Sequence, residues 1–151
     1  MARTENSIII ERPREFVFDV TNDLPRWTEL FTEYKEVKIL EHKDNKITFQ
    51  LTTFGDEEHK SMSWRSHRII DKANWKIKAQ REEPIFPWTH MNIEWHYDEV
   101  PEGTKLTFIQ EFGVDPKTGK TDEDGVVFIN KNSKIEMKHI KDTLESGKFD
   151  K

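Results

Sequence analysis

The chain is organised around the stretch Met62-Ser63-Trp64-Arg65-Ser66-His67-Arg68-Ile69-Ile70. Side chains in a β-strand point to alternate faces, so every second residue of this stretch shares a side. One face is mostly apolar and should point at the core; it carries Met62, Trp64, Ser66, Arg68 and Ile70. That face also holds a guanidinium, which keeps its charge and is costly to bury without a partner. Arg68 therefore has either a structural carboxylate partner or a place in a polar, functional cavity.

The composition indicates one domain whose core is built from few, large side chains. The 151 residues include ten Phe and five Trp, although only 34% are hydrophobic and 35% are charged. This length suffices for a single core. The net charge of −5 argues against nucleic-acid binding and against an anionic membrane surface. Without a signal peptide or a run of ~20 apolar residues, we expect a soluble, cytoplasmic protein.

The hydrophobic periodicity predicts one strand, two short helices, six further strands and a long C-terminal helix. The predicted strands cover residues 4–11, 34–40, 46–53, 59–70, 75–81, 90–100 and 105–113, and the helices cover 14–20, 24–31 and 126–146. This order is typical of an α+β domain in which a curved, seven-stranded antiparallel sheet grips one amphipathic helix. We expect residues 1–151 to form this one domain, with a ligand cavity between sheet and helix.

Several polar side chains fall at positions that should face the interior. They are Ser66, Arg68, Arg81 and Gln110 on strands, Asn130 and Ser133 on the long helix, and Tyr34 at the start of the second strand. Aromatic residues stand among them: Trp27, Phe31, Trp64, Phe86, Trp95 and Phe108. Apolar walls with a few placed polar groups are typical of a small-molecule pocket. Each aromatic ring can equally be ordinary core, and Arg81 can reach solvent from its strand end.

Several chemistries have no matching motif in the chain. There is no cysteine, and the six His are scattered without metal-ligand spacing, so we predict no metal. There is no Gly-rich phosphate loop and no Gly-x-Ser-x-Gly elbow. We also expect no close pair of carboxylates on an inward face. The remaining chemistry uses a cation and a phenol, because Arg68 can stabilise an enolate and Tyr34 can transfer a proton.

A set of short motifs resembles one known family. They are Asp19-Val20-Thr21-Asn22-Asp23, Trp27, Glu29-Leu30-Phe31, Glu33-Tyr34, Ser66-His67-Arg68, Trp95 and Gln110-Glu111-Phe112. Over nearly the whole chain, the sequence resembles the single-domain aromatase/cyclases of bacterial type II polyketide synthesis. The resemblance implies a START-like, Bet v 1-like helix-grip fold. It also implies an enzyme that closes the first ring of a poly-β-ketone by an aldol reaction and dehydrates it to an aromatic ring, with no cofactor. The implied partners are the acyl carrier protein that carries the chain and, further, the ketosynthase/chain-length factor.

The resemblance also assigns roles position by position. Arg68 matches an arginine that binds and polarises substrate carbonyls, Tyr34 a proton donor or acceptor, and Ser66 a pocket serine. The aromatic walls and the second pocket arginine are matched by Trp27, Phe31, Trp64, Trp95 and Arg81. We further expect Phe86, Met91, Phe108, Asn130 and Ser133 to bind substrate. The stretch between Arg81 and Met91 departs from the family pattern by one extra residue, with Pro84 and Pro87, which alters the pocket mouth at Phe86 and Trp88.

Two other functions stay open on the sequence alone. START-like folds commonly carry lipids or other apolar molecules without catalysis, and a fold does not determine a function. An interaction module that uses its acidic surface is the third possibility. The inward Arg68 and Tyr34 favour the enzyme, because a lipid carrier needs no cation in the middle of its pocket. In such an enzyme the shape of the pocket bends the chain and selects which ring forms.

Overall fold

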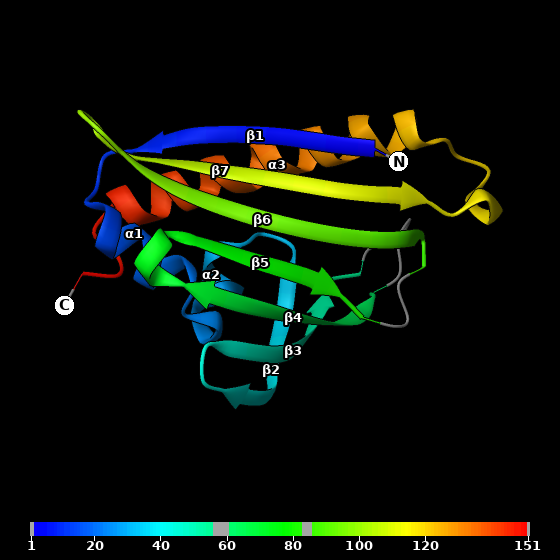
Figure 1. Ribbon diagram of the computed structural model, residues 1–151, viewed down its shortest axis with the longest axis horizontal. Coiled ribbons are helices and arrows are strands. Elements are labelled where there is room, and N and C mark those ends of the chain that lie inside the picture. Colours follow the sequence, from blue (N-terminus) through cyan, green and yellow to red (C-terminus); the bar gives the residue numbers. More distant parts are fainter. Residues whose placement is uncertain (1, 56–60, 83–85, 151) are drawn as a thin grey trace.

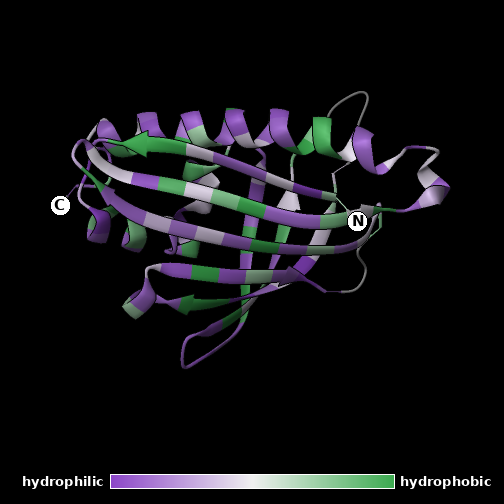
Figure 2. Ribbon diagram, turned by 45° about the horizontal axis from the view of Figure 1, so that its top comes forward, coloured by the Kyte–Doolittle hydropathy of each residue, from purple (hydrophilic) through white to green (hydrophobic). Residues whose placement is uncertain are grey.

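Seven strands form one open antiparallel sheet in the order β1-β7-β6-β5-β4-β3-β2 (Figure 1). The computed structural model describes residues 2–55, 61–82 and 86–150. The strands are β1 (Ala2–Ile10), β2 (Tyr34–Lys43), β3 (Lys46–Thr53), β4 (Ser63–Asp71), β5 (Lys76–Arg81), β6 (Trp88–Val100) and β7 (Gly103–Val114). Together with the long C-terminal helix, this confirms the predicted α+β arrangement. Hydrophobic and hydrophilic residues alternate along these strands, as Figure 2 shows.

The helices occupy the two ends of the chain. They are α1 (Arg14–Thr21), η1 (Leu24–Arg26), α2 (Trp27–Leu30) and α3 (Asp122–Glu145). The short turn η2 (Lys72–Asn74) links β4 to β5, and η3 (Pro116–Thr118) links β7 to α3. The predicted helix 24–31 is divided, because Pro25 opens a 3-10 turn before α2. α3 begins at Asp122 rather than at the predicted Val126. Its start is fixed by a capping box in which Thr121 and Asp124 satisfy each other's backbone N–H groups.

The alternation that was predicted for residues 62–70 holds within β4. Ser66 and Arg68 are buried, whereas Arg65 and Ile69 are exposed. The predicted start of this strand near His59 lies outside the described residues. Met62 was predicted to face inward, but it precedes β4 and is 43% exposed, so that prediction is wrong.

The second strand boundary to correct is that of β6. The sequence placed Trp88 in a loop because Pro87 precedes it, yet Trp88 starts β6, pairs with Val114 and is buried. Trp88 belongs to a small apolar cluster with Ala2, Met91, Phe112 and Ile129, apart from the main core. Ile93 packs against both clusters and joins them.

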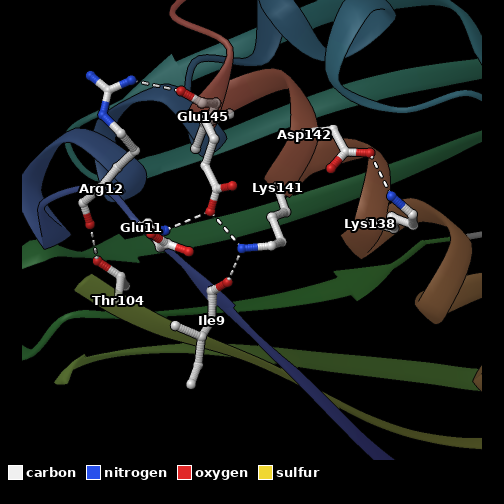
Figure 3. A network of polar contacts seen from close by, with 9 residues as sticks. Ile9, Glu11, Arg12, Thr104, Lys138, Lys141, Asp142 and Glu145 are labelled. Carbon is white, nitrogen blue, oxygen red and sulfur yellow. Dashed lines mark hydrogen bonds and ion pairs between the residues drawn. The ribbon is translucent and has the colours of Figure 1, made fainter. Parts of the chain in front are cut away.

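α3 lies along β1 and β7 and is fixed to the end of β1 by polar contacts (Figures 1 and 3). Lys141 Nζ donates to the backbone oxygen of Ile9 at 2.8 Å and to Glu145 Oε2 at 2.6 Å. The backbone N–H of Glu11 donates to the same Glu145 oxygen at 2.7 Å. The C-terminal half of α3 is therefore bound to the end of β1. In the described residues no helix is long and apolar enough to cross a membrane.

Candidate active site

Arg68 lies at the centre of the main core as a buried cation with little polar support. It is 2% exposed, and its Nη2 donates to Asn22 Oδ1 at 2.9 Å. Its guanidinium carbon lies 4.8 Å from the ring centroid of Trp27 and 4.5 Å from that of Trp95. The described residues include no ion-pair partner for Arg68, and its buried Nε has no hydrogen-bond acceptor. Burial lowers the pKa of Arg68 from 12.5 to about 10, against the opposing effect of Tyr97 and Tyr34.

The end of α1 holds Asn22, the amide that accepts the hydrogen bond from Arg68, in place. Asn22 Nδ2 donates to the backbone oxygen of Phe18 at 2.9 Å and to the Tyr97 hydroxyl at 3.1 Å. That hydroxyl also lies 2.6 Å from Thr21 Oγ1. Burial raises the pKa of Tyr97 to about 12, so its phenol keeps its proton. The resulting network orients the Asn22 amide oxygen toward Arg68. In the sequence, Thr21 and Asn22 stood out only as part of the motif at residues 19–23, and no role in the site was predicted for them.

Aromatic rings surround the Arg68 guanidinium. The rings of Trp27 and Trp95 stack with centroids 6.0 Å apart, and Phe108 stacks on Trp95 at 4.5 Å. Phe31 packs against Trp27 at 5.0 Å and against Trp95 at 6.2 Å. The structure thus brings four of the predicted wall residues together around Arg68. An indole face attracts a cation, so these rings stabilise the charge without accepting a hydrogen bond from it.

A second cluster forms where the chain passes from α2 into β2. Tyr34 packs on Phe31 at 5.1 Å and on Trp64 at 6.2 Å, and the guanidinium carbon of Arg81 lies 4.0 Å from the Trp64 ring. Burial raises the pKa of Tyr34 well above 10, and the Glu33 carboxylate adds to this rise. Burial also lowers the pKa of Arg81, whereas Tyr34 and Glu33 oppose that change. Tyr34, Trp64 and Arg81 thus form one group.

The prediction that no close carboxylate pair faces inward is wrong. Burial raises the pKa of Glu33, and the neighbouring Glu136 raises it further, while hydrogen bonds from Asn132 and Tyr34 act in the opposite sense. Glu136 is 3% exposed on α3 and accepts hydrogen bonds from the backbone N–H and the hydroxyl of Thr32. The sequence did not predict this pair for two reasons. Glu136 lies beside the apolar stripe of α3, and Glu33 lies in a turn, where side-chain alternation gives no signal.

The remaining predicted site residues divide between the two clusters of the core. Ser66 is buried and pairs with Arg81 across β4 and β5, which places it beside the Tyr34 group. Met91 belongs instead to the Trp88 cluster. Ser133 Oγ donates to Gln110 Oε1 at 3.3 Å, and Gln110 Nε2 lies 3.6 Å from the Met91 sulfur. Asn130 accepts a hydrogen bond from Asn6 on β1 at 3.0 Å. Met91, Asn130 and Ser133 therefore make their contacts away from Arg68.

The two hollows found in the described residues lie elsewhere than between the sheet and α3, where the sequence predicted a cavity. Phe86, expected to bind substrate, is 55% exposed and lies at the surface, whereas Pro84 lies outside the described residues. One hollow of about 370 Å³ is formed by α1, η1 and the C-terminal residues, and another of about 250 Å³ lies on the outer face of β4–β6. Neither hollow is lined by a predicted site residue. In the described residues no cluster of His, Asp or Glu could hold a metal ion.

A family model and two relatives in sequence match most of the chain. The model described as "Polyketide cyclase / dehydrase and lipid transport" matches residues 10–147. A protein of Streptomyces cyaneus, provisionally named a polyketide cyclase, is 42% identical over 142 residues, which cover 94% of this chain and 93% of that protein. A protein of Streptomyces halstedii with the same provisional name is 40% identical over 106 residues, covering 70% of this chain and 96% of that protein.

Solved structures share the fold at lower sequence identity. The aromatase/cyclase Zhui from Streptomyces sp. R1128 gives a TM-score of 0.73 at 19% identity and covers 91% of this chain and 87% of that one. The di-domain aromatase/cyclase BexL gives 0.79 at 19% identity over 99% of this chain, which spans 48% of BexL. Ara h 8.0201 gives a TM-score of 0.74 at 15% sequence identity, and the match covers 96% of this chain and 98% of that one. With the family match over most of its length, the chain belongs to the polyketide cyclase / dehydrase and lipid transport family.

Proposed function

We propose that this chain is an aromatase/cyclase that closes and aromatises the first ring of a poly-β-ketone carried by an acyl carrier protein. The observation that carries the proposal is Arg68: a buried cation with a neutral amide as its partner and an Nε that lacks an acceptor. A structural arginine would be expected to meet a carboxylate. A guanidinium that still has N–H groups to donate suits a substrate whose carbonyl oxygens become negatively charged during reaction.

Ring closure needs two groups that act on the substrate. An enol carbon attacks a ketone carbon, a C–C bond forms, and the ketone oxygen becomes an oxyanion that Arg68 stabilises. The oxyanion takes one proton and becomes an alcohol. The alcohol takes a second proton and leaves as water while the neighbouring carbon loses a proton, and enolisation of the remaining ring ketones makes the ring aromatic. Oxidation state does not change overall, so the reaction needs no redox cofactor. Holding the two carbons in contact can lower the barrier by ~7–11 kcal/mol.

The Tyr34 group is suited to the proton transfers. The pKa of the Tyr34 phenol is raised by burial, so it stays protonated at neutral pH and can donate. Glu33 is adjacent and has a raised pKa, which brings this carboxyl closer to the range in which an acid can also act as a base. We assign the donation to Tyr34 and its reprotonation to Glu33. A water held by Ser66 is the alternative donor.

A polyketide chain must separate the rings that enclose Arg68 in order to reach it. Trp27 lies on α2, a helix of four residues, and Phe31 caps that helix. Short elements with few hydrogen bonds open at low free-energy cost, so we place substrate entry at α2.

The test is reconstitution with a minimal polyketide synthase and malonyl-CoA. The wild type is expected to shift the products from spontaneous shunt compounds to one first-ring isomer. Arg68→Ala should reduce that yield about a hundredfold to a thousandfold, as expected for the loss of an oxyanion donor. Arg65→Ala is the matched control, because Arg65 is the exposed arginine on the opposite face of the same strand. Equal activity of Arg68→Ala and wild type would refute the role of Arg68.

The runner-up function is a non-catalytic carrier of a lipid or another apolar molecule. The family description includes lipid transport, and the interior is mostly aromatic. Mass spectrometry of ligands extracted from the purified protein distinguishes the two functions. A stoichiometric lipid, combined with unchanged products in the reconstitution, would favour the carrier over the enzyme.

A further inference from the structure

The outward face of α3 carries large apolar side chains that are largely exposed to solvent. Val127 is 69% exposed, Phe128 is 58% exposed and Ile135 is 50% exposed. Lysines lie between and beyond these positions on the same face of the helix, because residues three or four apart are neighbours on a helix surface. We call this surface the α3 stripe; it consists of Val127, Phe128, Lys131, Lys134, Ile135 and Lys138. Figure 2 shows a hydrophobic segment in the first turns of α3.

The α3 stripe is basic, although the chain as a whole has a net charge of −5. Residues 126–141 contain four lysines and one acidic residue, Glu136, which is buried on the inner side of the helix against Thr32. Lys138 is paired with Asp142 at 2.8 Å. Within the described part of the chain, Lys131 and Lys134 have no ion-pair partner. The stripe therefore offers two free cations beside exposed apolar groups.

The same helix forms one wall of the candidate active site. Asn132 and Glu136 face Glu33 from its inner side, and Ser133 bonds to Gln110. The α3 stripe is thus the back of the element whose inner face meets the Tyr34 group. The N-terminal end of the α3 stripe reaches the start of β6, where the Phe128 ring lies 6.4 Å from that of Trp88.

We propose that the α3 stripe docks an acidic helix of the acyl carrier protein that delivers the substrate. This inference rests on the proposed function for the identity of the partner. At a rise of ~1.5 Å per residue, the stripe spans roughly 16 Å, enough for about three turns of a partner helix. Such a helix would place apolar side chains on Val127, Phe128 and Ile135 and carboxylates opposite the lysines.

Other partners fit the stripe less well. A nucleic acid or an anionic membrane favours a protein with a wide basic field, whereas the few lysines here stand on an acidic molecule. Docking on α3 would also bring a tethered chain to the helix that walls the site, so that it need not cross the sheet. The mixture of apolar and cationic groups accordingly favours an acidic protein partner.

The experiment measures binding of a holo acyl carrier protein from an aromatic polyketide synthase by fluorescence anisotropy. We expect the double charge reversal Lys131→Glu with Lys134→Glu to raise the Kd about tenfold or more, and rising salt to weaken wild-type binding. The matched control is Lys43→Glu with Lys46→Glu, which makes the same charge change at two exposed lysines of the β2–β3 turn. The control should bind as the wild type does. Equal Kd values for wild type and the α3 double variant would overturn the proposal.

Kinetics separate this inference from the proposed function. With a carrier-bound poly-β-ketone, the α3 double variant should show a raised KM and an unchanged kcat, and a soluble thioester analogue without a carrier should be turned over as by wild type. Turnover of neither substrate by wild type would refute the enzyme, while the anisotropy result would still decide the docking surface. Two further outcomes would overturn the docking proposal. One is a wild-type dimer in sedimentation that becomes a monomer in the double variant. The other is wild-type binding to vesicles with an anionic lipid that the double variant no longer shows.

Discussion

Replacing Arg68 with Met should reduce activity about a hundredfold to a thousandfold while leaving the protein as stable as before, or slightly more stable. The fold lowers the pKa of Arg68 from 12.5 to about 10, which corresponds to a penalty of about 3 kcal/mol on the charged form. The substitution removes that penalty and keeps an apolar side chain of similar length. It also leaves the Asn22 amide oxygen without its donor, at about 1 kcal/mol, and ends the contacts with the Trp27 and Trp95 rings, at about 1 kcal/mol. The net change is a gain of about 1 kcal/mol in the free energy of unfolding.

Urea unfolding followed by tryptophan fluorescence measures this change, and a thermal scan should show the melting temperature raised by about 2–4 °C. Phe49→Ala is the reference for an ordinary core truncation, since Phe49 is 2% exposed in the same core and should lose about 3–5 kcal/mol. Product analysis of the same Arg68→Met sample should show the spontaneous shunt compounds. A loss of stability above about 2 kcal/mol would mean that Arg68 serves the fold, and the reasoning for a functional cation would then be wrong.

Three further predictions concern the fold and the carboxylate pair. Because the pKa of Glu33 is raised above 4.5 in the folded protein, the native state binds the proton more tightly, and its stability falls as pH rises from near 4.5 through the folded pKa. Glu33→Gln should lose this fall, which urea midpoints at acidic and neutral pH will show; parallel pH profiles of both proteins would contradict it. Thr121→Ala should cost about 1 kcal/mol by removing the capping box, seen as a lower urea midpoint, whereas Thr121→Ser should not. Gly125→Ala should destabilise the protein by about 1–2 kcal/mol in spite of better helix propensity, since the new Cβ would lie 2.7 Å from Val114 Cγ2 and 2.8 Å from Phe112 Cε2. A stabilised variant would show instead that β7 moves to make room for the methyl group.

The alternation of side chains along single strands carried most of the fold prediction. In β4 it placed Ser66 and Arg68 inside and Ile69 outside, as the structure does, because a period of two allows no other assignment once the strand is recognised. It failed where a strand begins next to a proline. Pro87 argued for a loop, yet Trp88 pairs with Val114 because burial of its indole outweighs local propensity.

The sequence predicted the cation and the aromatic rings of the candidate site but not the residues that hold them in place. Trp27, Trp95 and Phe108 are apolar residues on regular elements, so periodicity predicted that they face inward, and the structure brings their rings together around Arg68. Asn22 lies directly after a helix, where a polar residue normally serves the backbone, and no pattern in one sequence connects it with a residue 46 positions later. Glu33 and Glu136 meet only because the turn before β2 packs on α3, a tertiary contact that neither local sequence contains.

The two edge strands of the sheet, β1 and β2, are protected in different ways from pairing with a strand of another molecule. Free strand edges act as templates on which another molecule can add a strand. At the end of β1, Lys141 occupies the Ile9 carbonyl and Glu145 occupies the Glu11 N–H, so α3 covers that edge (Figure 3). Along β2, two register shifts against β3 interrupt the ladder and leave the edge irregular. Substrate entry at α2, as proposed above, would expose the aromatic interior and make self-association easier at that moment. In that state the two edges would limit the addition of a strand from a second molecule.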